Sequence, residues 1–190
     1  MALREASPID PGLEACASAS FPEATHNRDR CLCFTGHRLI QNKDVPALTA
    51  ALDNALEEAW ADGFRFFFSG AALGFDLLAA RAVLRLRRAH PDARLLLALP
   101  CPTQADRWSS QDRITYQDIL SEADHVVCVS PAYFEGCMQK RNRYMVDHSA
   151  LCLCYLRTCR GGTWYTVSYA YDQGLEIRNL ALTLGGPGFT

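Results

Sequence analysis

The stretch Phe64-Arg-Phe-Phe-Phe-Ser-Gly-Ala-Ala-Leu-Gly-Phe-Asp-Leu-Leu-Ala-Ala-Arg-Ala-Val-Leu-Arg-Leu86 decides the fold of this chain. It opens with an aromatic run that has no polar alternation, which is typical of a strand buried on both faces of a parallel sheet. The run ends at Ser69-Gly70, and small residues lead through Gly74 into a strongly apolar helix. These residues therefore predict a buried strand, a glycine-containing turn and a helix.

The turn in this unit has the features of an anion site. Gly70 and Gly74 can adopt positive φ and let a ligand approach the backbone. The first turn of the helix presents unpaired N–H groups and the positive end of the helix dipole, which favour phosphate. Asp76, in that first turn, either caps the helix or faces a ligand hydroxyl. A plain strand, turn and helix explains one such unit equally well, but the unit recurs along the chain.

The same alternation of strand and helix continues through the sequence. We predict strands over residues 31–35, 64–69, 93–99, 125–129, 150–156 and 175–180, with one helix in each interval. Such alternation implies right-handed β-α-β units. The expected fold class is α/β, a single doubly wound, mostly parallel Rossmann-like sheet with helices on both faces. This domain is predicted to cover residues 30–182, between a flexible N-terminal arm (residues 1–29) and a flexible tail (residues 183–190).

The composition narrows the functional classes. The chain has 190 residues, of which 49% are hydrophobic and 21% charged, as in a globular domain. A formal net charge of -2 argues against a general binder of nucleic acids or membrane surfaces. The first residues lack the apolar core of a signal peptide, and no apolar run reaches membrane-spanning length. We therefore expect a cytoplasmic protein without a membrane partner.

Nine cysteines raise the question of a metal or disulfide framework. Two Cys-Leu-Cys pairs, Cys31 with Cys33 and Cys152 with Cys154, each place two thiols on one face of a strand. We expect another strand between these two strands, which separates the pairs by roughly 10 Å. Zinc is bound by thiolates at about 2.3 Å, so no metal site is expected. The cysteines are interpreted as small buried apolar residues.

In doubly wound sheets, ligands bind at the carboxyl ends of the strands, near the point where the strand order reverses. Glycine, basic and aromatic residues follow several of the predicted strands. These segments are Gly36-His37-Arg38, Ser69-Gly70, Gln104 to Trp108, and Gly161-Gly162-Thr163. Their common position at one edge of the sheet predicts a ligand site there.

Five motifs occur in an order that resembles a known family. They are Phe34-Thr-Gly-His-Arg38, Ser69-Gly-Ala-Ala-Leu-Gly-Phe-Asp76, Trp108, Arg141-Asn-Arg-Tyr-Met145 and Gly161-Gly-Thr163. Together they resemble the YpsA-like branch of the SLOG superfamily over residues 31–180. This superfamily has Rossmann-like domains and includes the Lonely Guy phosphoribohydrolases and the DNA-processing protein DprA. The resemblance implies binding of a nucleotide or nucleotide-derived ligand, with no other cofactor required.

The residue chemistry is compatible with that implication. The ligand-binding residues carried over from the motifs are Gly36, His37, Arg38, Ser69, Gly70, Gly74, Asp76, Trp108, Arg141, Asn142, Gly161, Gly162 and Thr163. Backbone N–H groups at the glycine pair suit phosphate, and arginines supply bidentate donors. Trp108 either stacks on a base or fills the core under its loop. His37 is an acid-base group or only a hydrogen-bonding residue.

The chain departs from the hydrolase pattern of the Lonely Guy enzymes. In those enzymes a catalytic glutamate closely follows the glycine-rich turn, whereas here Trp164-Tyr165-Thr166-Val167 follows Gly162-Thr163 without a carboxylate. N-glycosidic cleavage usually needs a carboxylate to stabilise the sugar cation or activate water. If the protein is an enzyme, the candidate catalytic residues are Asp76, acting from across the site, and Arg141.

Several functions remain as alternatives. The leading hypothesis is a binding or sensor domain for a ligand such as ADP-ribose, an NAD-related compound or a nucleoside phosphate. The others are a nucleotide N-glycoside hydrolase, a DprA-like single-strand DNA binder, and a protein-interaction module with a vestigial pocket. The absence of a basic stripe with interleaved aromatic residues counts against nucleic acid. The turn after the first strand lacks the Gly-x-Gly-x-x-Gly fingerprint of dinucleotide oxidoreductases. A homodimer is implied by the family resemblance.

Overall fold

The structure is a computed structural model that describes residues 27–182. The predicted C-terminal tail lies outside this range, and so does the predicted N-terminal arm apart from its last three residues. Within the described range, a single 3-10 turn, η2 (Arg28–Arg30), leads directly into the first strand. Its Arg28 side chain donates through Nε to the carbonyl of Ser149 at 2.8 Å, so this turn is held against the domain.

The strands form one parallel sheet. They are β1 (Cys31–Gly36), β2 (Phe66–Ser69), β3 (Arg94–Leu99), β4 (His125–Cys128), β5 (Leu151–Tyr155) and β6 (Glu176–Asn179). Their order is β4-β3-β2-β1-β5-β6, and all neighbouring pairs are parallel. The α/β, Rossmann-like fold class is confirmed.

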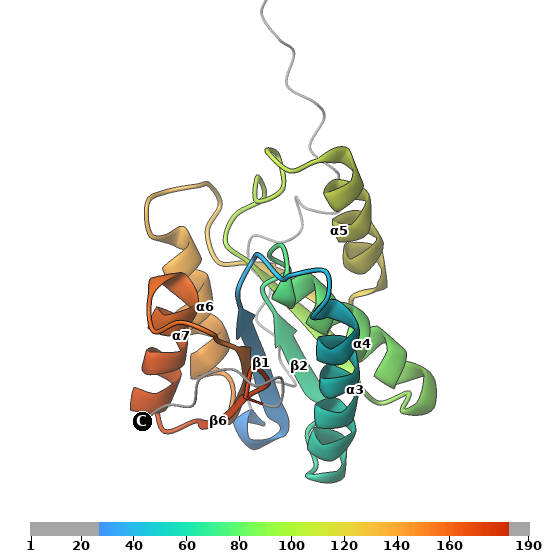
Figure 1. The fold of residues 1–190 in the computed structure, drawn as a ribbon. Coiled ribbons are helices and arrows are strands. Elements are labelled where there is room, and N and C mark those ends of the chain that lie inside the picture. Colours follow the sequence, from blue (N-terminus) through green and yellow to red (C-terminus); the bar gives the residue numbers. More distant parts are fainter. Residues whose placement is uncertain (1–26, 183–190) are drawn as a thin grey trace, which may run out of the picture.

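Five helices cover the two faces of the sheet (Figure 1). One layer consists of α3 (Val45–Ala61), α4 (Phe75–Ala89) and α5 (Ser110–Glu122), and the other of α6 (Cys137–Asp147) and α7 (Gly161–Asp172). The residues of β1 alternate between these layers. Leu32 and Phe34 join the core under α3 and α4, whereas Cys31 and Cys33 join the core under α6 and α7. A strand that is buried on both sides in this way needs no polar alternation.

The strand order reverses at β1. After β4, at one edge of the sheet, the chain returns through α6 and places β5 on the free side of β1. The loops that leave β1 and β5 therefore diverge toward opposite layers, which opens a crevice above their carboxyl ends. His37 and Arg157, which follow these two strands, are joined by a hydrogen bond from the Arg157 backbone N–H to His37 Nε2 at 2.9 Å.

The neighbouring positions of β1 and β5 overturn the expected separation of the two Cys-Leu-Cys pairs. Cys33 pairs in register with Cys152, and Cys154 lies beside Thr35, with no strand between them. All four thiols are buried, and no cluster of His, Cys, Asp or Glu suited to a metal ion occurs within residues 27–182. A thiol hydrogen bond to Cys152 and burial raise the pKa of Cys33 well above its ordinary value, so this thiol stays protonated. The order of strands along a chain does not disclose which strands are adjacent, and the expected separation was wrong for that reason.

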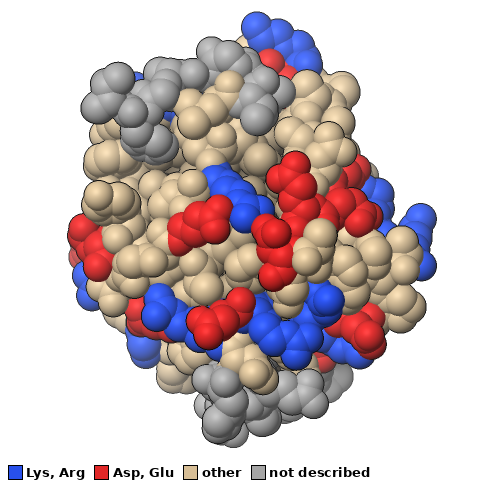
Figure 2. All heavy atoms as spheres, turned by 90° about the horizontal axis from the view of Figure 1, so that it is seen from below, with Lys and Arg blue, Asp and Glu red and all other residues tan. Residues whose placement is uncertain are grey.

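Ion pairs gather at the amino ends of the strands, the face shown in Figure 2. Arg178 bonds both Asp62 and Glu176, and Arg94 and Arg87 share Asp124. In the figure, acidic and basic side chains lie next to one another across this face. Their charges compensate locally, so this face offers no extended field of one sign.

No helix within the described residues is long and apolar enough to cross a membrane.

Candidate functional site

A cavity of about 380 Å³ opens at the carboxyl ends of β1 and β5, which is the upper edge of the sheet in Figure 1. Nine of the thirteen predicted ligand-binding residues line it. They are Gly36, His37, Arg38, Asp76, Arg141, Asn142, Gly161, Gly162 and Thr163. The cavity is therefore built from four segments that are separate in sequence, and we call it the first cavity.

Three predicted residues of the turn between β2 and α4, namely Ser69, Gly70 and Gly74, do not line the first cavity but support its floor. Ser69 donates its hydroxyl to the Asp76 carbonyl at 3.0 Å and accepts the N–H of Ala71 at 3.1 Å. Gly70 has no room for a Cβ, because the Arg141 guanidinium occupies that place. Gly74 has φ 83° and lies against the backbone of Arg38. These residues position the start of α4 and do not line the cavity.

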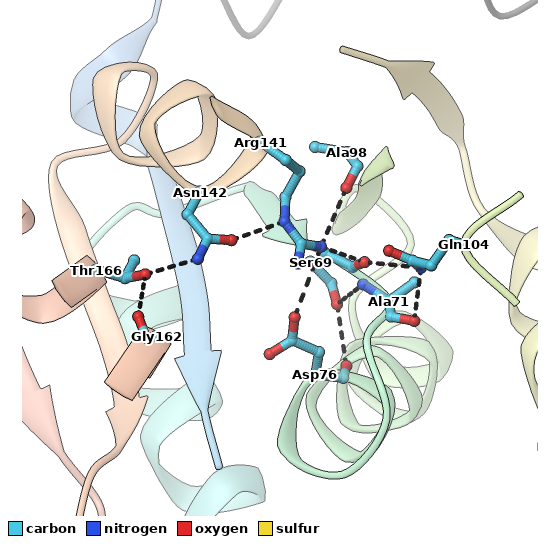
Figure 3. Close-up of polar contacts among 10 residues, drawn as sticks. Ser69, Ala71, Asp76, Ala98, Gln104, Arg141, Asn142, Gly162 and Thr166 are labelled. Atoms are coloured by element: carbon cyan, nitrogen blue, oxygen red, sulfur yellow. Dashed lines mark hydrogen bonds and ion pairs between the residues drawn. The ribbon is translucent and has the colours of Figure 1, made fainter. Parts of the chain in front are cut away.

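A buried carboxylate and a buried guanidinium face each other at the base of the cavity (Figure 3). Asp76 Oδ2 and Arg141 Nη1 are 4.0 Å apart. Burial raises the pKa of Asp76 to about 6, although Arg141 and the backbone N–H groups of Ala72 and Gly70 oppose this shift. Burial also lowers the pKa of Arg141 from its ordinary value, against the effect of Asp76. The carboxylate is ionised at neutral pH and changes charge just below it.

Arg141 braces the floor of the site. Its Nη1 donates to the carbonyl of Gly70 and to that of Ala98 at 3.4 Å, and its Nε donates to Asn142 Oδ1 at 2.7 Å. The side chain thus ties α6 to the turn after β2 and to β3. Of the three guanidinium nitrogens of Arg141, only Nη2 makes no hydrogen bond within residues 27–182. We therefore expect Nη2 to make any contact of this arginine with a ligand.

Asn142 continues the network toward the start of α7. Its Nδ2 donates to Thr166 Oγ1 at 2.7 Å, and Thr166 in turn donates to the carbonyl of Gly162 at 2.9 Å (Figure 3). Both ends of the Asn142 amide are therefore engaged by protein groups. This residue was predicted to bind the ligand, and the structure shows that its amide also connects the floor of the cavity to the glycine turn.

His37 makes hydrogen bonds that are typical of a neutral imidazole. Its Nε2 accepts the backbone N–H of Arg157 at 2.9 Å, and its ring lies edge-on to Tyr155. Burial and the nearby Arg157 charge lower its pKa from the ordinary value. Because Nε2 is occupied by a backbone donor, the geometry favours the hydrogen-bonding alternative over the acid-base one.

Asp44 directly precedes α3, where an aspartate commonly caps the first N–H groups of a helix, but its side chain makes no capping hydrogen bond. The carboxylate instead pairs with Arg157 at 2.8 Å, across the loop that follows β5. This ion pair connects the loops on the two sides of the crevice.

Trp108 does not line the first cavity. It lines a second cavity of about 610 Å³ beside the first, where Gln104, Tyr133 and Leu73 also contribute. The half-buried indole lies edge-on to Tyr116, with ring centroids 5.2 Å apart. The two cavities adjoin, since Arg38 and two further residues, Ala72 and Met138, line both of them.

Five residues that line the first cavity are absent from the sequence-based set. They are Thr35, Ala72, Met138, Thr158 and Arg160. Arg160 directly precedes the glycine pair, and that position was the available signal for it. Of the others, Thr35 lies near the end of β1, Met138 lies in the first turn of α6, and Ala72 and Thr158 lie in loops, and tertiary packing decides that they face the same cavity. Arg38, Arg107 and Arg160 border the two cavities, and their guanidinium groups make no hydrogen bond or ion pair within the described residues.

Comparison with known proteins assigns the family. The YspA SLOG family, which is represented by YpsA, matches residues 32–176. The chain belongs to this family. It is 32% identical over 116 residues to YoqJ, an uncharacterized SPbeta prophage-derived protein of Bacillus subtilis, and this alignment covers 55% of the chain and 68% of YoqJ. A UPF0398 protein of Bacillus cereus is 30% identical over 138 residues, which cover 71% of the chain and 74% of that protein.

A solved structure has a similar fold. DNA processing protein A (DprA) from Streptococcus pneumoniae superposes with a TM-score of 0.57 at 16% sequence identity. The superposition covers 78% of this chain and 49% of the DprA chain, so the chain spans about half the length of that protein. At this identity the likeness concerns the fold. Together with the family match, it confirms the resemblance that the motifs indicate.

Proposed function

We propose that this SLOG domain binds a nucleotide-derived ligand, such as ADP-ribose, an NAD-like compound or a nucleoside phosphate, in the first cavity. One observation carries the proposal: within residues 27–182, the cavity combines a glycine-rich helix start without a side-chain cap and arginines without a partner with a buried carboxylate. These are the groups needed for a phosphate and for a sugar hydroxyl. Family membership agrees with a ligand of this class.

The phosphate is expected at the amino end of α7. This helix begins at Gly161, which has φ 80°, and the side chain of its N-cap residue, Arg160, makes no capping hydrogen bond. A Cβ at Gly161 or Gly162 would meet no atom within 4 Å, so there is open space in front of the turn. Backbone N–H groups and the helix dipole favour an anion there. Arg38 and Arg160 supply compensating positive charge.

The sugar is expected beside Asp76. Its carboxylate is ionised above pH of about 6 and can accept hydrogen bonds from vicinal hydroxyl groups. Arg141 holds the floor beneath it through the turn after β2. Because both groups are buried, contacts to them are stronger than the same contacts in water. We therefore expect Asp76→Asn to weaken binding of ribose-containing ligands.

A second function, hydrolysis of a nucleotide N-glycosidic bond, is favoured by one observation. A buried carboxyl group whose pKa is raised to about 6 is suited to proton transfer near neutral pH. Among the described residues that line the first cavity, Asp76 is the single carboxylate. Incubation with nucleoside monophosphates tests this function, since hydrolysis releases free base. Release that is unchanged in Asp76→Asn would contradict the role given to this residue.

A thermal-shift panel of AMP, ADP-ribose, NAD and cyclic and linear dinucleotides tests the binding function. A ligand at about 100 times its dissociation constant stabilises the fold by roughly 2.7 kcal/mol. For a domain of this size the melting temperature then rises by about 5–10 °C. The rise should be lost in Arg38→Ala and in Gly162→Val, which places methyl groups where the phosphate is expected.

The matched control is Arg88→Ala, which removes an exposed arginine of α4 that lines neither cavity. This variant should retain the full shift. Absence of a shift with every compound would overturn the proposal. It would then favour a protein-interaction module with a vestigial pocket.

A further inference from the structure

We infer that the second cavity holds a flat aromatic ring system of the ligand whose phosphate lies in the first cavity. The inference rests on the proposed function and adds to it the part of the ligand that distinguishes one phosphate compound from another. It depends on three features: the second cavity adjoins the first, aromatic side chains line it, and a rigid turn lies between the two cavities.

The two cavities adjoin. Arg38, Ala72 and Met138 line both, and the Arg38 guanidinium makes no hydrogen bond or ion pair with residues 27–182. A ligand whose phosphate is bound at α7 can therefore extend past Arg38 into the second cavity. The guanidinium is then close to the negative charge of the ligand and to the face of its ring, and arginine forms favourable contacts with both.

The walls of the second cavity suit a flat ring. Trp108 is held in position by its edge-on contact with Tyr116 and by packing against the core. Tyr133 lines the same cavity and is 66% exposed, so its ring is accessible to a ligand. Leu73 adds an aliphatic surface. Base–aromatic stacking between such groups tolerates many heterocycles.

The turn between the cavities is held rigidly. Gln104 donates through Nε2 to the carbonyl of Gly70 at 3.3 Å and to that of Ala71 at 3.1 Å. Ala71 has φ 46°, a left-handed conformation that is strained for alanine. Strain of this kind persists only where surrounding contacts enforce it, and it is concentrated at ligand sites. The next residue, Ala72, has a small side chain and lines both cavities.

These features favour a ligand in which an aromatic heterocycle is joined through a sugar to phosphate. A sugar phosphate without an aromatic heterocycle would leave the second cavity empty. The test is isothermal titration of the full chain with ADP-ribose, AMP and ribose 5-phosphate. Binding of ADP-ribose or AMP should be about 5- to 100-fold tighter than binding of ribose 5-phosphate, which is the range expected from stacking of one base.

Two variants locate the ring. Trp108→Ala and Tyr133→Ala should each lower the affinity for the base-containing ligand several-fold and leave the affinity for ribose 5-phosphate unchanged. Tyr133 is largely exposed, so its variant keeps the test valid if Trp108→Ala is unstable. The control is Tyr171→Ala, which removes an exposed tyrosine of α7 that lines neither cavity and should change neither affinity. Trp108 fluorescence in a Trp60→Phe, Trp164→Phe background should be quenched by the same ligands.

Each result separates the two proposals. Equal affinity for ribose 5-phosphate and the base-containing ligands, with no effect of the Trp108 and Tyr133 variants, overturns the aromatic subsite and leaves the phosphate site supported. Binding of a base-containing ligand that depends on Trp108 but not on Arg38 or Gly162 supports the subsite and contradicts the phosphate placement. Failure of every phosphate compound to bind overturns both.

Discussion

At the residue scale, Asp76 is the group whose protonation reports on the site. Its pKa is raised to about 6, so between pH of about 4 and 6 the folded protein holds a proton that the unfolded chain has already lost. The free energy of unfolding contributed by this residue therefore falls as pH rises through that window and is constant above it. For a shift of this size the fall is roughly 3 kcal/mol.

Comparison of the wild type with Asp76→Asn isolates this contribution. Unfolding in denaturant at pH 4, 5, 6 and 7 should show the wild type losing stability relative to the variant by up to about 3 kcal/mol. Other carboxylates titrate in both proteins, so their effects cancel in the difference. A difference that is independent of pH would show that the folded Asp76 titrates like an exposed carboxylate.

Gly70 is a second residue with a defined requirement. A Cβ at this position would overlap the buried Arg141 guanidinium and approach Asp76 Oδ2 to 2.8 Å. Gly70→Ala must therefore displace a buried charged side chain, and we expect it to lower the free energy of unfolding by about 3 kcal/mol. Gly162→Ala is the matched control, because a Cβ there meets no atom within 4 Å. Equal urea midpoints for the two variants would contradict the observed packing.

At the scale of elements, the hydrogen bonds from Asn142 through Thr166 connect α6 to the first turn of α7. Thr166 is 1% exposed, and valine has nearly its shape but no hydroxyl. Thr166→Val leaves the Asn142 amide and the Gly162 carbonyl without this partner, which costs about 1–3 kcal/mol. The melting temperature should fall by several degrees, and phosphate ligands should bind more weakly. Thr166→Ser keeps the hydroxyl and should restore both properties; failure of serine to do so would assign the effect to packing.

At the scale of the whole molecule, the two edges of the sheet differ in how their arginines are paired. Arginines at the amino ends form exposed ion pairs, whereas Arg38, Arg107 and Arg160 border the cavities without a partner in the described part of the chain. Exposed pairs contribute about 0–1 kcal/mol each and are screened by salt. An anion drawn by unpaired arginines is also screened, because the Debye length falls from about 30 Å at 0.01 M to about 3 Å at 1 M salt.

This difference predicts separate responses to salt. Between about 0.05 M and 0.5 M NaCl, the dissociation constant for ADP-ribose should rise several-fold, while the melting temperature of the free protein should change by only a few degrees. Titration calorimetry and thermal melts in the same buffers measure the two quantities. An affinity that does not change with salt would contradict a phosphate placed beside these arginines.

Much of this architecture follows from local sequence. The unbroken apolar run at residues 64–69 predicts a strand covered on both faces, and regular alternation with helices predicts a parallel sheet. The carboxyl ends of parallel strands lie at one edge, so glycine and arginine residues that follow several strands could be assigned to a common site. Nine of the predicted residues do line one cavity there. Periodicity and turn chemistry are local properties, and local sequence carries them.

Only the tertiary structure decided how these elements combine. Sequence order does not reveal that β5 lies beside β1, which brings Cys33 next to Cys152. Nor does it reveal that Arg141 is buried as a brace under the Gly70 turn, or that Trp108 lines a separate cavity. Each of these outcomes depends on which strands become neighbours and on how loops pack over the sheet. Those contacts join residues that are distant in the chain, and short-range sequence patterns contain no information about them.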